Sequence, residues 1–360
     1  MERQEADMKK FTGMILILIT FLVFTACQNT DGEAVSNWNG NTQGKISSGS
    51  EDEIENNKTE EQREAKQVSY TTEVPKEYRR EAQQQGEIVR VEYETKDYTS
   101  TSDETIIKPA YVYLPYGYGE NDRETKYDIL YMMHGWTMTA ESYFDPSSSD
   151  MIDLFDNLIE NGDMRPTIIV SATFDTENQP QDFGRSTEEI AEFHQELRND
   201  LMPYIESHFH TYAEGISEAD FRNSRAHRAF TGFSLGGVTT WYQFVYNLDY
   251  IRNFIPMSGD CWILGTYGGR YQPVETTKYL ENVVKDGDWE KDDFYIYAAI
   301  GTSDPIWDQV NNQLEEMMKS DEFTPDNLHY AIKEGGRHDM VAATEYLYHA
   351  LPIIFGVKTR

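Results

Sequence analysis

Apolar and polar positions alternate along residues 87–93 and again along residues 110–115. This period of two is typical of strands with one buried face, and we expect the two segments to pair antiparallel at the edge of a sheet. Residues 127–133 are mostly apolar, which indicates a central strand buried on both faces. Further short apolar runs that we expect to be strands occupy residues 167–171, 229–231, 254–257, 294–300 and 328–332.

Segments with helical character lie between these strands. Residues 150–160 form an amphipathic pattern that ends at Asn161-Gly162, and a last helix is expected at about residues 341–355. Ser186 and Glu189 have the spacing of a capping box, which predicts a long helix from there to about His208. Because strands alternate with helices, we predict an α/β fold with a mostly parallel central sheet and helices on both faces.

The N-terminal region differs from this domain. Lys9 and Lys10 precede an apolar run from Phe11 to Phe24, and Thr25-Ala26-Cys27 follows. A basic start, an apolar core and small residues at its end are typical of an export signal, and the run is shorter than the roughly 20 residues of a membrane-spanning helix. The cysteine resembles a bacterial lipobox, so residues 1–27 are predicted to be a lipoprotein signal peptide with Cys27 as the lipidated residue. A plain secretory signal or an uncleaved anchor is the alternative.

Residues 28 to about 67 are polar and nearly free of large apolar side chains, and residues 68–85 are transitional, so we predict a disordered tether over residues 28–85 and a single domain from residue 86 to 360. Together with a lipid anchor, this predicts an extracytoplasmic protein attached to the cell membrane, or a secreted one if the lipobox is not used.

The charge restricts the class of partner. The formal net charge is -32, from 31 Lys and Arg against 63 Asp and Glu. Nucleic-acid binding requires clustered cations and is excluded, whereas neutral partners such as polysaccharide are compatible with this charge. Nothing in the sequence indicates a protein partner. With Cys27 lipidated, Cys261 is the one cysteine left, so no intrachain disulfide is expected, and we interpret Cys261 as a small buried residue rather than a nucleophile.

Candidate chemistry centres on Ser234. The segment Gly232-Phe233-Ser234-Leu235-Gly236 follows the apolar run 229–231, and residues 238–244 can continue as a buried helix. A G-x-S-x-G sequence between a strand and a helix is typical of a nucleophile elbow, in which the serine hydroxyl is exposed on a tight turn. We predict Ser234 to be a nucleophile, and an ordinary structural turn is the alternative.

A serine nucleophile needs a base and an acid that orients the base. In serine hydrolases with a sheet of this kind, the order along the chain is serine, acid, histidine, and each residue lies at the carboxyl end of a strand. Asp304 follows the strand at 294–300 and is the predicted acid, although an Asx turn before Pro305 would give the same sequence. Asp260, after the preceding strand, remains the second candidate. His338, which follows Gly335 and Gly336 after the last strand, is the predicted base.

A serine nucleophile also needs hydrogen-bond donors for the oxyanion, the negatively charged oxygen that forms when the serine attacks a carbonyl group. In such a hydrolase the backbone N–H groups of Leu235 and Trp136 would donate to it, and His134 would support the loop that carries Trp136. The pair His208 and His210 has no further metal ligand nearby in the sequence, so neither a metal nor another cofactor is predicted.

These motifs resemble the esterase D/feruloyl esterase family of α/β-hydrolases, which includes carbohydrate esterase family 1. The resemblance covers about residues 86–355 and rests on the segments at 112–115, 133–135, 232–237, 301–304 and 336–339. It implies an α/β-hydrolase fold and metal-free acyl transfer through an acyl-enzyme on Ser234. Arg337, inserted where members commonly have Gly-Gly-His-Asp, is a departure and is interpreted as lining the entrance.

The resemblance also implies the substrate class, because many members release feruloyl or acetyl groups from plant polysaccharide. An exported enzyme fits esters of polysaccharides or oligosaccharides such as xylan, and we expect Trp136, Trp262, Trp307 and Arg337 to contact the substrate. The hypothesis is therefore an extracytoplasmic serine esterase. The alternatives are a siderophore esterase of the enterobactin type and a non-catalytic carbohydrate-binding lipoprotein.

Overall fold

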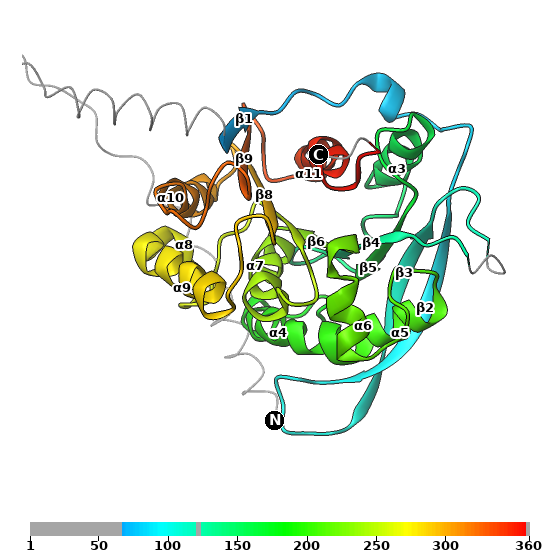
Figure 1. Ribbon diagram of the computed structural model, residues 1–360, viewed down its shortest axis with the longest axis horizontal. Coiled ribbons are helices and arrows are strands. Elements are labelled where there is room, and N and C mark those ends of the chain that lie inside the picture. Colours follow the sequence, from blue (N-terminus) through cyan, green and yellow to red (C-terminus); the bar gives the residue numbers. More distant parts are fainter. Residues whose placement is uncertain (1–66, 120–123, 358–360) are drawn as a thin grey trace, which may run out of the picture. The chain divides into compact units, whose positions relative to one another are not determined.

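The computed structural model describes residues 67–119 and 124–357, and one nine-stranded sheet runs through this part of the chain (Figure 1). Seven strands pair in parallel with their neighbours, and the two remaining strands, residues 105–114 and 87–96, lie at one edge of the sheet and pair antiparallel. The predicted antiparallel pair at the sheet edge is therefore confirmed. The order across the sheet is β1 (Val68–Tyr70), β9 (Leu328–Lys333), β8 (Tyr295–Gly301), β7 (Asn253–Met257), β6 (Arg228–Phe233), β4 (Asp128–Met133), β5 (Thr167–Ala172), β3 (Thr105–Leu114) and β2 (Glu87–Lys96).

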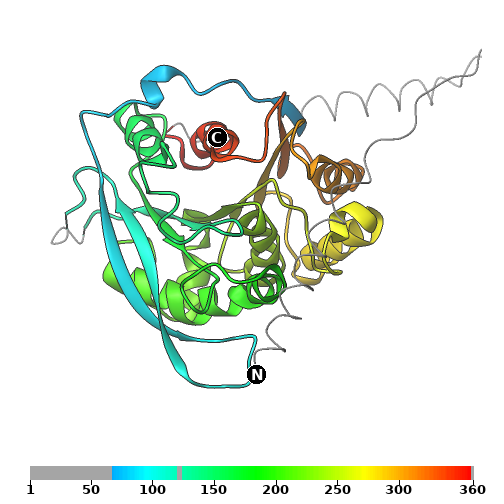
Figure 2. The same cartoon turned by 180° about the vertical axis from the view of Figure 1, so that it is seen from behind.

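Helices pack on both faces of the sheet, as Figures 1 and 2 show from opposite sides. One face is covered by α3 (Met151–Glu160) and α11 (Met340–Phe355). The other face carries α4 (Phe183–Glu196), the π-helical η2 (Leu197–Leu201), α5 (Met202–His208), α7 (Leu235–Asn247), α9 (Pro273–Asp286) and α10 (Trp307–Met317). The short helices α6 (Glu218–Asn223) and α8 (Gly268–Tyr271) lie in connecting segments. The predicted fold class is confirmed.

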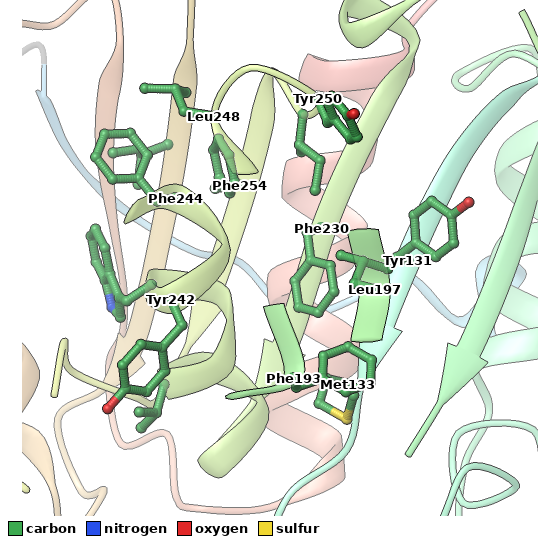
Figure 3. Packing of buried hydrophobic residues seen from close by; sticks show 14 of the residues in the cluster. Tyr131, Met133, Phe193, Leu197, Phe230, Tyr242, Phe244, Leu248, Tyr250 and Phe254 are labelled. Atoms are coloured by element: carbon green, nitrogen blue, oxygen red, sulfur yellow. The ribbon is translucent and has the colours of Figure 1, made fainter. Parts of the chain in front are cut away.

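The continuous apolar pattern of β4 has the expected cause. Tyr131 and Met133 face the core shared with α4 and α7, and Leu130 and Met132 face the core shared with α3 and α11. Because successive side chains of a strand point to opposite faces, a strand between two helical layers needs apolar residues at nearly every position. Figure 3 shows the first of these cores, where Phe193 of α4 and Phe230 of β6 lie close to Met133.

The start of the long helix differs from the prediction. Helix α4 begins at Phe183, and the side chain of Asp182 caps it by accepting from the backbone N–H of Arg185 at 3.1 Å. Ser186 lies buried within the helix and does not cap it. Asp is as good an N-cap residue as Ser, so the sequence contains two possible starts and tertiary packing selects the earlier one. The predicted end near His208 is confirmed.

The predicted boundary between tether and domain at residue 86 is wrong. Strand β1 pairs in parallel with β9, and the backbone N–H of Thr71 donates to the carbonyl of Ile332 at 2.8 Å. Val74 and Ala82 are buried against the domain. β1 has only three residues, and its place in the sheet comes from backbone hydrogen bonds to a strand far away in the sequence, which local composition does not reveal. The predictions for residues 1–27 and 28–66 lie outside the described residues, within which no helix is long and apolar enough to span a bilayer.

A buried ion pair anchors the start of β6, and its removal is expected to destabilise the fold. Arg228 is 1% exposed and donates to Glu206 twice, from Nε to Oε1 at 2.6 Å and from a terminal nitrogen to Oε2 at 2.8 Å. Arg228→Met leaves the Glu206 carboxylate buried without its cation, so we expect a loss of about 3–5 kcal/mol in the free energy of unfolding, measured in urea. The double variant Arg228→Met/Glu206→Met should recover most of this loss. A cost below about 1 kcal/mol for the single variant would contradict the assignment.

Candidate active site

The predicted strand–turn–helix arrangement is present around Ser234. Ser234 connects β6 to α7 with φ 61° and ψ −120°, a backbone conformation that side-chain-bearing residues rarely adopt. The turn is closed by two glycines: a Cβ on Gly232 would lie 2.4 Å from the backbone of Gly236, and one on Gly236 would lie 1.9 Å from the carbonyl oxygen of Met133. Any larger residue at either position would open the turn, so the glycines hold the serine hydroxyl at the carboxyl end of the sheet.

Ser234, His338 and Asp304 form a chain of hydrogen bonds. His338 Nε2 lies 2.9 Å from Ser234 Oγ, and His338 Nδ1 lies 2.9 Å from Asp304 Oδ2 and 3.1 Å from Oδ1. With its proton on Nδ1, the neutral imidazole donates to the carboxylate and accepts from the serine hydroxyl through Nε2. The Asp304 side chain is fully buried, whereas that of His338 is 27% exposed and reachable from solvent. This arrangement can move the hydroxyl proton to the imidazole.

The sheet order explains why these residues meet. Strands β8 and β9 are neighbours, so the loops after Gly301 and Lys333 emerge side by side. A Cβ on Gly301 would lie 2.3 Å from the carbonyl oxygen of Gly336, and the backbone N–H of Ser303 donates to that carbonyl at 2.9 Å. Asp304 Oδ1 also accepts from the backbone N–H of Ile306 at 3.0 Å, which is the Asx turn considered above. The same carboxylate therefore closes a turn and contacts the histidine.

Asp260, the second candidate for the acid, has a different partner. It lies after β7, is 1% exposed, and its Oδ1 accepts from the indole N–H of Trp262 at 2.7 Å. No hydrogen bond joins it to His338 among the described residues. Burial raises the pKa of Asp260 to about 6. Its carboxyl group holds the indole in place, and the contact with the histidine belongs to Asp304.

The raised pKa of Asp260 predicts a pH dependence of stability. The folded protein binds this proton more tightly than the unfolded chain, whose aspartates titrate near 3.9, so the contribution is favourable below about pH 4 and is lost as the pH rises through 6. We expect the wild type to lose about 2–3 kcal/mol between pH 4 and 7 relative to Asp260→Asn. Urea unfolding of both proteins across this range measures the difference, and parallel stability curves would show that Asp260 does not titrate there.

The loop after β4 lies against the nucleophile. A Cβ on Gly135 would come within 3.1 Å of Ser234 Cβ, so the Gly135–Trp136 backbone borders the serine. Within the described part of the chain, neither the Trp136 nor the Leu235 backbone N–H donates a hydrogen bond. Two amide donors without acceptors beside a serine hydroxyl are suited to hold a developing oxyanion.

His134 holds this loop in place. It is completely buried, its Nδ1 donates to the carbonyl oxygen of Gly135 at 2.9 Å, and its Nε2 lies 2.7 Å from the hydroxyl of Thr173. Burial lowers the pKa of His134 to about 4, so the ring is neutral at pH 7. A neutral ring with both nitrogens hydrogen-bonded is positioned to orient the loop, and within the described part of the chain it forms no hydrogen bond with Ser234.

Four aromatic side chains, Trp136, Phe183, Trp262 and Tyr267, form a row that begins at this loop. Ring centroids are 5.3 Å apart between Trp136 and Phe183, 6.2 Å between Phe183 and Trp262, and 5.1 Å between Trp262 and Tyr267, each pair edge to face. Trp136 is 43% exposed, whereas Trp262 is buried. The structure therefore brings two of the predicted substrate contacts together. Phe183 was missed, because an aromatic residue in the first turn of a helix looks like a core residue in the sequence.

Two other predicted contacts do not join this row. Trp307 is the first residue of α10 and lies beside Tyr330 of β9, with ring centroids 6.5 Å apart. Arg337 is exposed next to His338, and no ion pair of its side chain is found in the described ranges. Trp307 thus packs partly on the core, and Arg337 remains available at the surface.

The alternative chemistries find little support. Cys261 is 1% exposed, and burial raises the pKa of its thiol to about 12, so a thiolate nucleophile is disfavoured. The His208 ring stacks on Tyr204, while the His210 ring lies beside Tyr118. Among residues 67–119 and 124–357, no group of three or more His, Cys, Asp or Glu side chains could hold a metal ion.

Comparison with known proteins gives consistent matches. Residues 108–338 match the family model Esterase, described as "Putative esterase". The chain is 33% identical over 250 residues to endo-1,4-beta-xylanase Y of Acetivibrio thermocellus, which covers 68% of this chain and 21% of the relative. It is 30% identical over 238 residues to an endo-1,4-beta-xylanase/feruloyl esterase of Xylanibacter ruminicola, covering 65% of this chain and 27% of the relative. The chain thus spans about a fifth to a quarter of the length of these curated relatives.

A solved structure is similar over nearly its whole length. It is a serine-to-alanine mutant of the feruloyl esterase module from Clostridium thermocellum, complexed with sinapinate. The match has a TM-score of 0.69 at 30% identity and covers 82% of this chain and 97% of that one.

Proposed function

The chain belongs to the esterase family and is a serine esterase, and from this premise we propose that it hydrolyses feruloyl or acetyl esters of plant polysaccharide such as xylan through an acyl-enzyme on Ser234. The observation that carries the proposal is the hydrogen-bonded chain from Ser234 through His338 to Asp304 beside two backbone donors without acceptors. A family match alone does not assign catalytic roles to residues, whereas this geometry supplies a nucleophile, a base, an orienting acid and an oxyanion site together.

In the first half of the reaction, Ser234 Oγ attacks the ester carbonyl carbon while His338 Nε2 takes the hydroxyl proton. The negative charge that develops on the carbonyl oxygen is held by the backbone N–H groups of Leu235 and Trp136. Asp304 keeps the proton of His338 on Nδ1 and stabilises the imidazolium. His338 then protonates the leaving sugar oxygen as its bond to the carbonyl carbon breaks, which leaves the acyl group on Ser234.

The second half repeats these steps with water. His338 removes a proton from a water molecule, whose oxygen attacks the acyl-enzyme at the same carbonyl carbon, and the oxyanion occupies the same two amides. The Ser234–acyl bond then breaks, His338 returns the proton to Ser234 Oγ, and the free carboxylic acid leaves. The balance is one ester plus one water giving one acid and one sugar hydroxyl.

A hydroxycinnamoyl group is the acyl group that the surroundings favour. The aromatic row starts at Trp136, whose backbone N–H is an oxyanion donor in this mechanism, so an acyl chain on Ser234 has aromatic side chains beside it. Aromatic rings pack well edge to face against such side chains. The similarity to the feruloyl esterase module that binds sinapinate supports the same class.

The location of the enzyme rests on the sequence alone. The signal-like segment ending at Cys27 supports an extracytoplasmic protein held at the membrane by a lipid on that cysteine. Metabolic labelling with a radioactive fatty acid tests this, because Cys27→Ser should abolish incorporation, and a labelled variant would refute lipidation at this residue.

The substrate proposal is tested by comparing esters on the purified protein. We expect hydrolysis of methyl ferulate and of feruloylated xylan at rates above those on acetylated xylan, since only the aromatic acyl group uses the row. Higher rates on acetylated xylan would assign the acetyl ester instead. Absence of activity on all three, in a protein that still reacts with a fluorophosphonate, would refute polysaccharide esters as substrates while retaining the serine mechanism.

A further inference from the structure

A groove of about 570 Å³ lies next to the candidate active site and shares Trp262 with the aromatic row. Its other walls come from four separate parts of the chain: the tip of the β2–β3 hairpin, α4, Tyr242 of α7 and the loop after Trp262. The mechanism above makes no use of this space. Its position beside the acyl site raises the question of which part of the substrate it receives.

The groove continues from the aromatic row along α4. Phe183 belongs to the row, and Thr187 and Ala191, which line the groove, follow it at intervals of four residues. Residues spaced by four lie on one face of a helix, about one turn or 5.4 Å apart. A sugar chain that passes the acyl group near Phe183 can therefore follow the same face of α4 for about two turns.

Side chains that line the groove are held by hydrogen bonds to neighbouring residues. Arg185 of α4 donates to Asp97 in the hairpin tip at 2.8 Å and also to the hydroxyl of Thr99, and Figure 1 shows the hairpin extending to α4. The hydroxyl of Tyr98 donates to Asp200 at 2.9 Å, and that of Tyr242 donates to the carbonyl of Trp262 at 3.2 Å. Because these side chains are already held, a ligand need not order them on binding.

The lining favours a neutral, hydroxyl-rich ligand. Glu188 and Glu192 place carboxylates at the groove, and no Lys or Arg is among its lining residues. Carboxylates accept hydrogen bonds from hydroxyl groups and repel anions, and the half-buried ring of Tyr98 offers an aromatic surface to the apolar face of a sugar ring. We propose that this groove binds the sugar chain that carries the ester, as a subsite separate from the acyl site. The inference rests on the proposed function for the identity of the sugar, a β-linked xylose chain.

The test compares a long and a short substrate in the same variants. Thr266→Trp fills the groove from an exposed position, and Glu192→Ala removes an acceptor from its wall. We expect both variants to lower kcat/KM for a feruloylated xylo-oligosaccharide by about tenfold or more while that for methyl ferulate changes less than about twofold. Glu275→Ala, which removes an exposed carboxylate on α9 away from the groove, is the matched control and should leave both values unchanged.

Equal losses on both substrates would overturn the proposal, because the groove would then support the acyl site or the fold. Unchanged values on both would overturn it as well. Binding is measured separately by calorimetry with unesterified xylo-oligosaccharide and the full chain carrying Ser234→Ala. Binding that Thr266→Trp abolishes supports the subsite even if ester hydrolysis fails, and no binding refutes it even if methyl ferulate is hydrolysed. The two proposals can therefore fail independently.

Discussion

Replacing Ser234 with Ala is expected to lower kcat on methyl ferulate by about 10⁴- to 10⁶-fold while the protein remains folded. The hydroxyl oxygen is the atom that attacks the ester carbon, and His338 has no other nucleophile within the hydrogen-bonded chain. Without the hydroxyl oxygen no acyl-enzyme can form. The oxyanion donors and substrate binding remain, and they give a small residual rate. Steady-state kinetics with the variant at high concentration measures the loss.

Folding and labelling provide the controls for this variant. Ser234 is only partly buried, and alanine has less bulk at a position with strained backbone, so the thermal unfolding temperature should stay close to that of the wild type. A fluorophosphonate should label the wild type and not the variant. Near-wild-type turnover in Ser234→Ala would refute the covalent mechanism, whereas loss of activity accompanied by unfolding would not test it and calls for Ser234→Cys as the substitute.

Replacing Asp304 with Asn is expected to lower kcat by about 10⁴-fold at neutral pH. The amide oxygen of Asn can still accept from the backbone N–H of Ile306, which preserves the turn. Its NH₂ group then faces His338 and favours the tautomer with the proton on Nε2, so that nitrogen can no longer accept the proton of Ser234. The effect should appear in kcat more than in KM, since the fully buried side chain of Asp304 is not accessible to a substrate.

Asp260→Asn is the matched control, because both aspartates are buried after neighbouring strands. Asn at this position can still accept from the indole N–H of Trp262, so we expect kcat on methyl ferulate to fall less than about tenfold. If Asp260→Asn lost as much activity as predicted for Asp304→Asn, and Asp304→Asn retained activity, the acid would have to be reassigned.

Much of the fold could be predicted from local patterns, because strands and helices depend on the periodicity of nearby apolar residues. The runs around residues 127–133 and 294–300 appear as β4 and β8, and the glycines around Ser234 indicate a turn that few sequences can form. Prediction from the local sequence failed where two residues could each cap the same helix. Asp182 and Ser186 are both competent caps, and only the packing of α4 on the sheet distinguishes them.

Strand β1 and the aromatic residue Phe183 show a second limit. β1 is held by backbone hydrogen bonds to β9, a strand about 260 residues away, and side-chain composition carries no signal of that pairing. Phe183 acquires its place in the aromatic row from Trp136 and Trp262, which approach it from two other loops. Neither feature has a local cause.

By itself, the sequence determined an α/β fold with a serine on a strand-to-helix turn, an acid and a histidine to follow it, because each of these depends on residues close together in the chain. It favoured Asp304 over Asp260 as the acid but could not establish which of them contacts His338, since both follow a strand of the same sheet. That was decided by the tertiary structure alone: β8 lies between β7 and β9, so the loop carrying Asp304 is the one adjacent to the loop carrying His338.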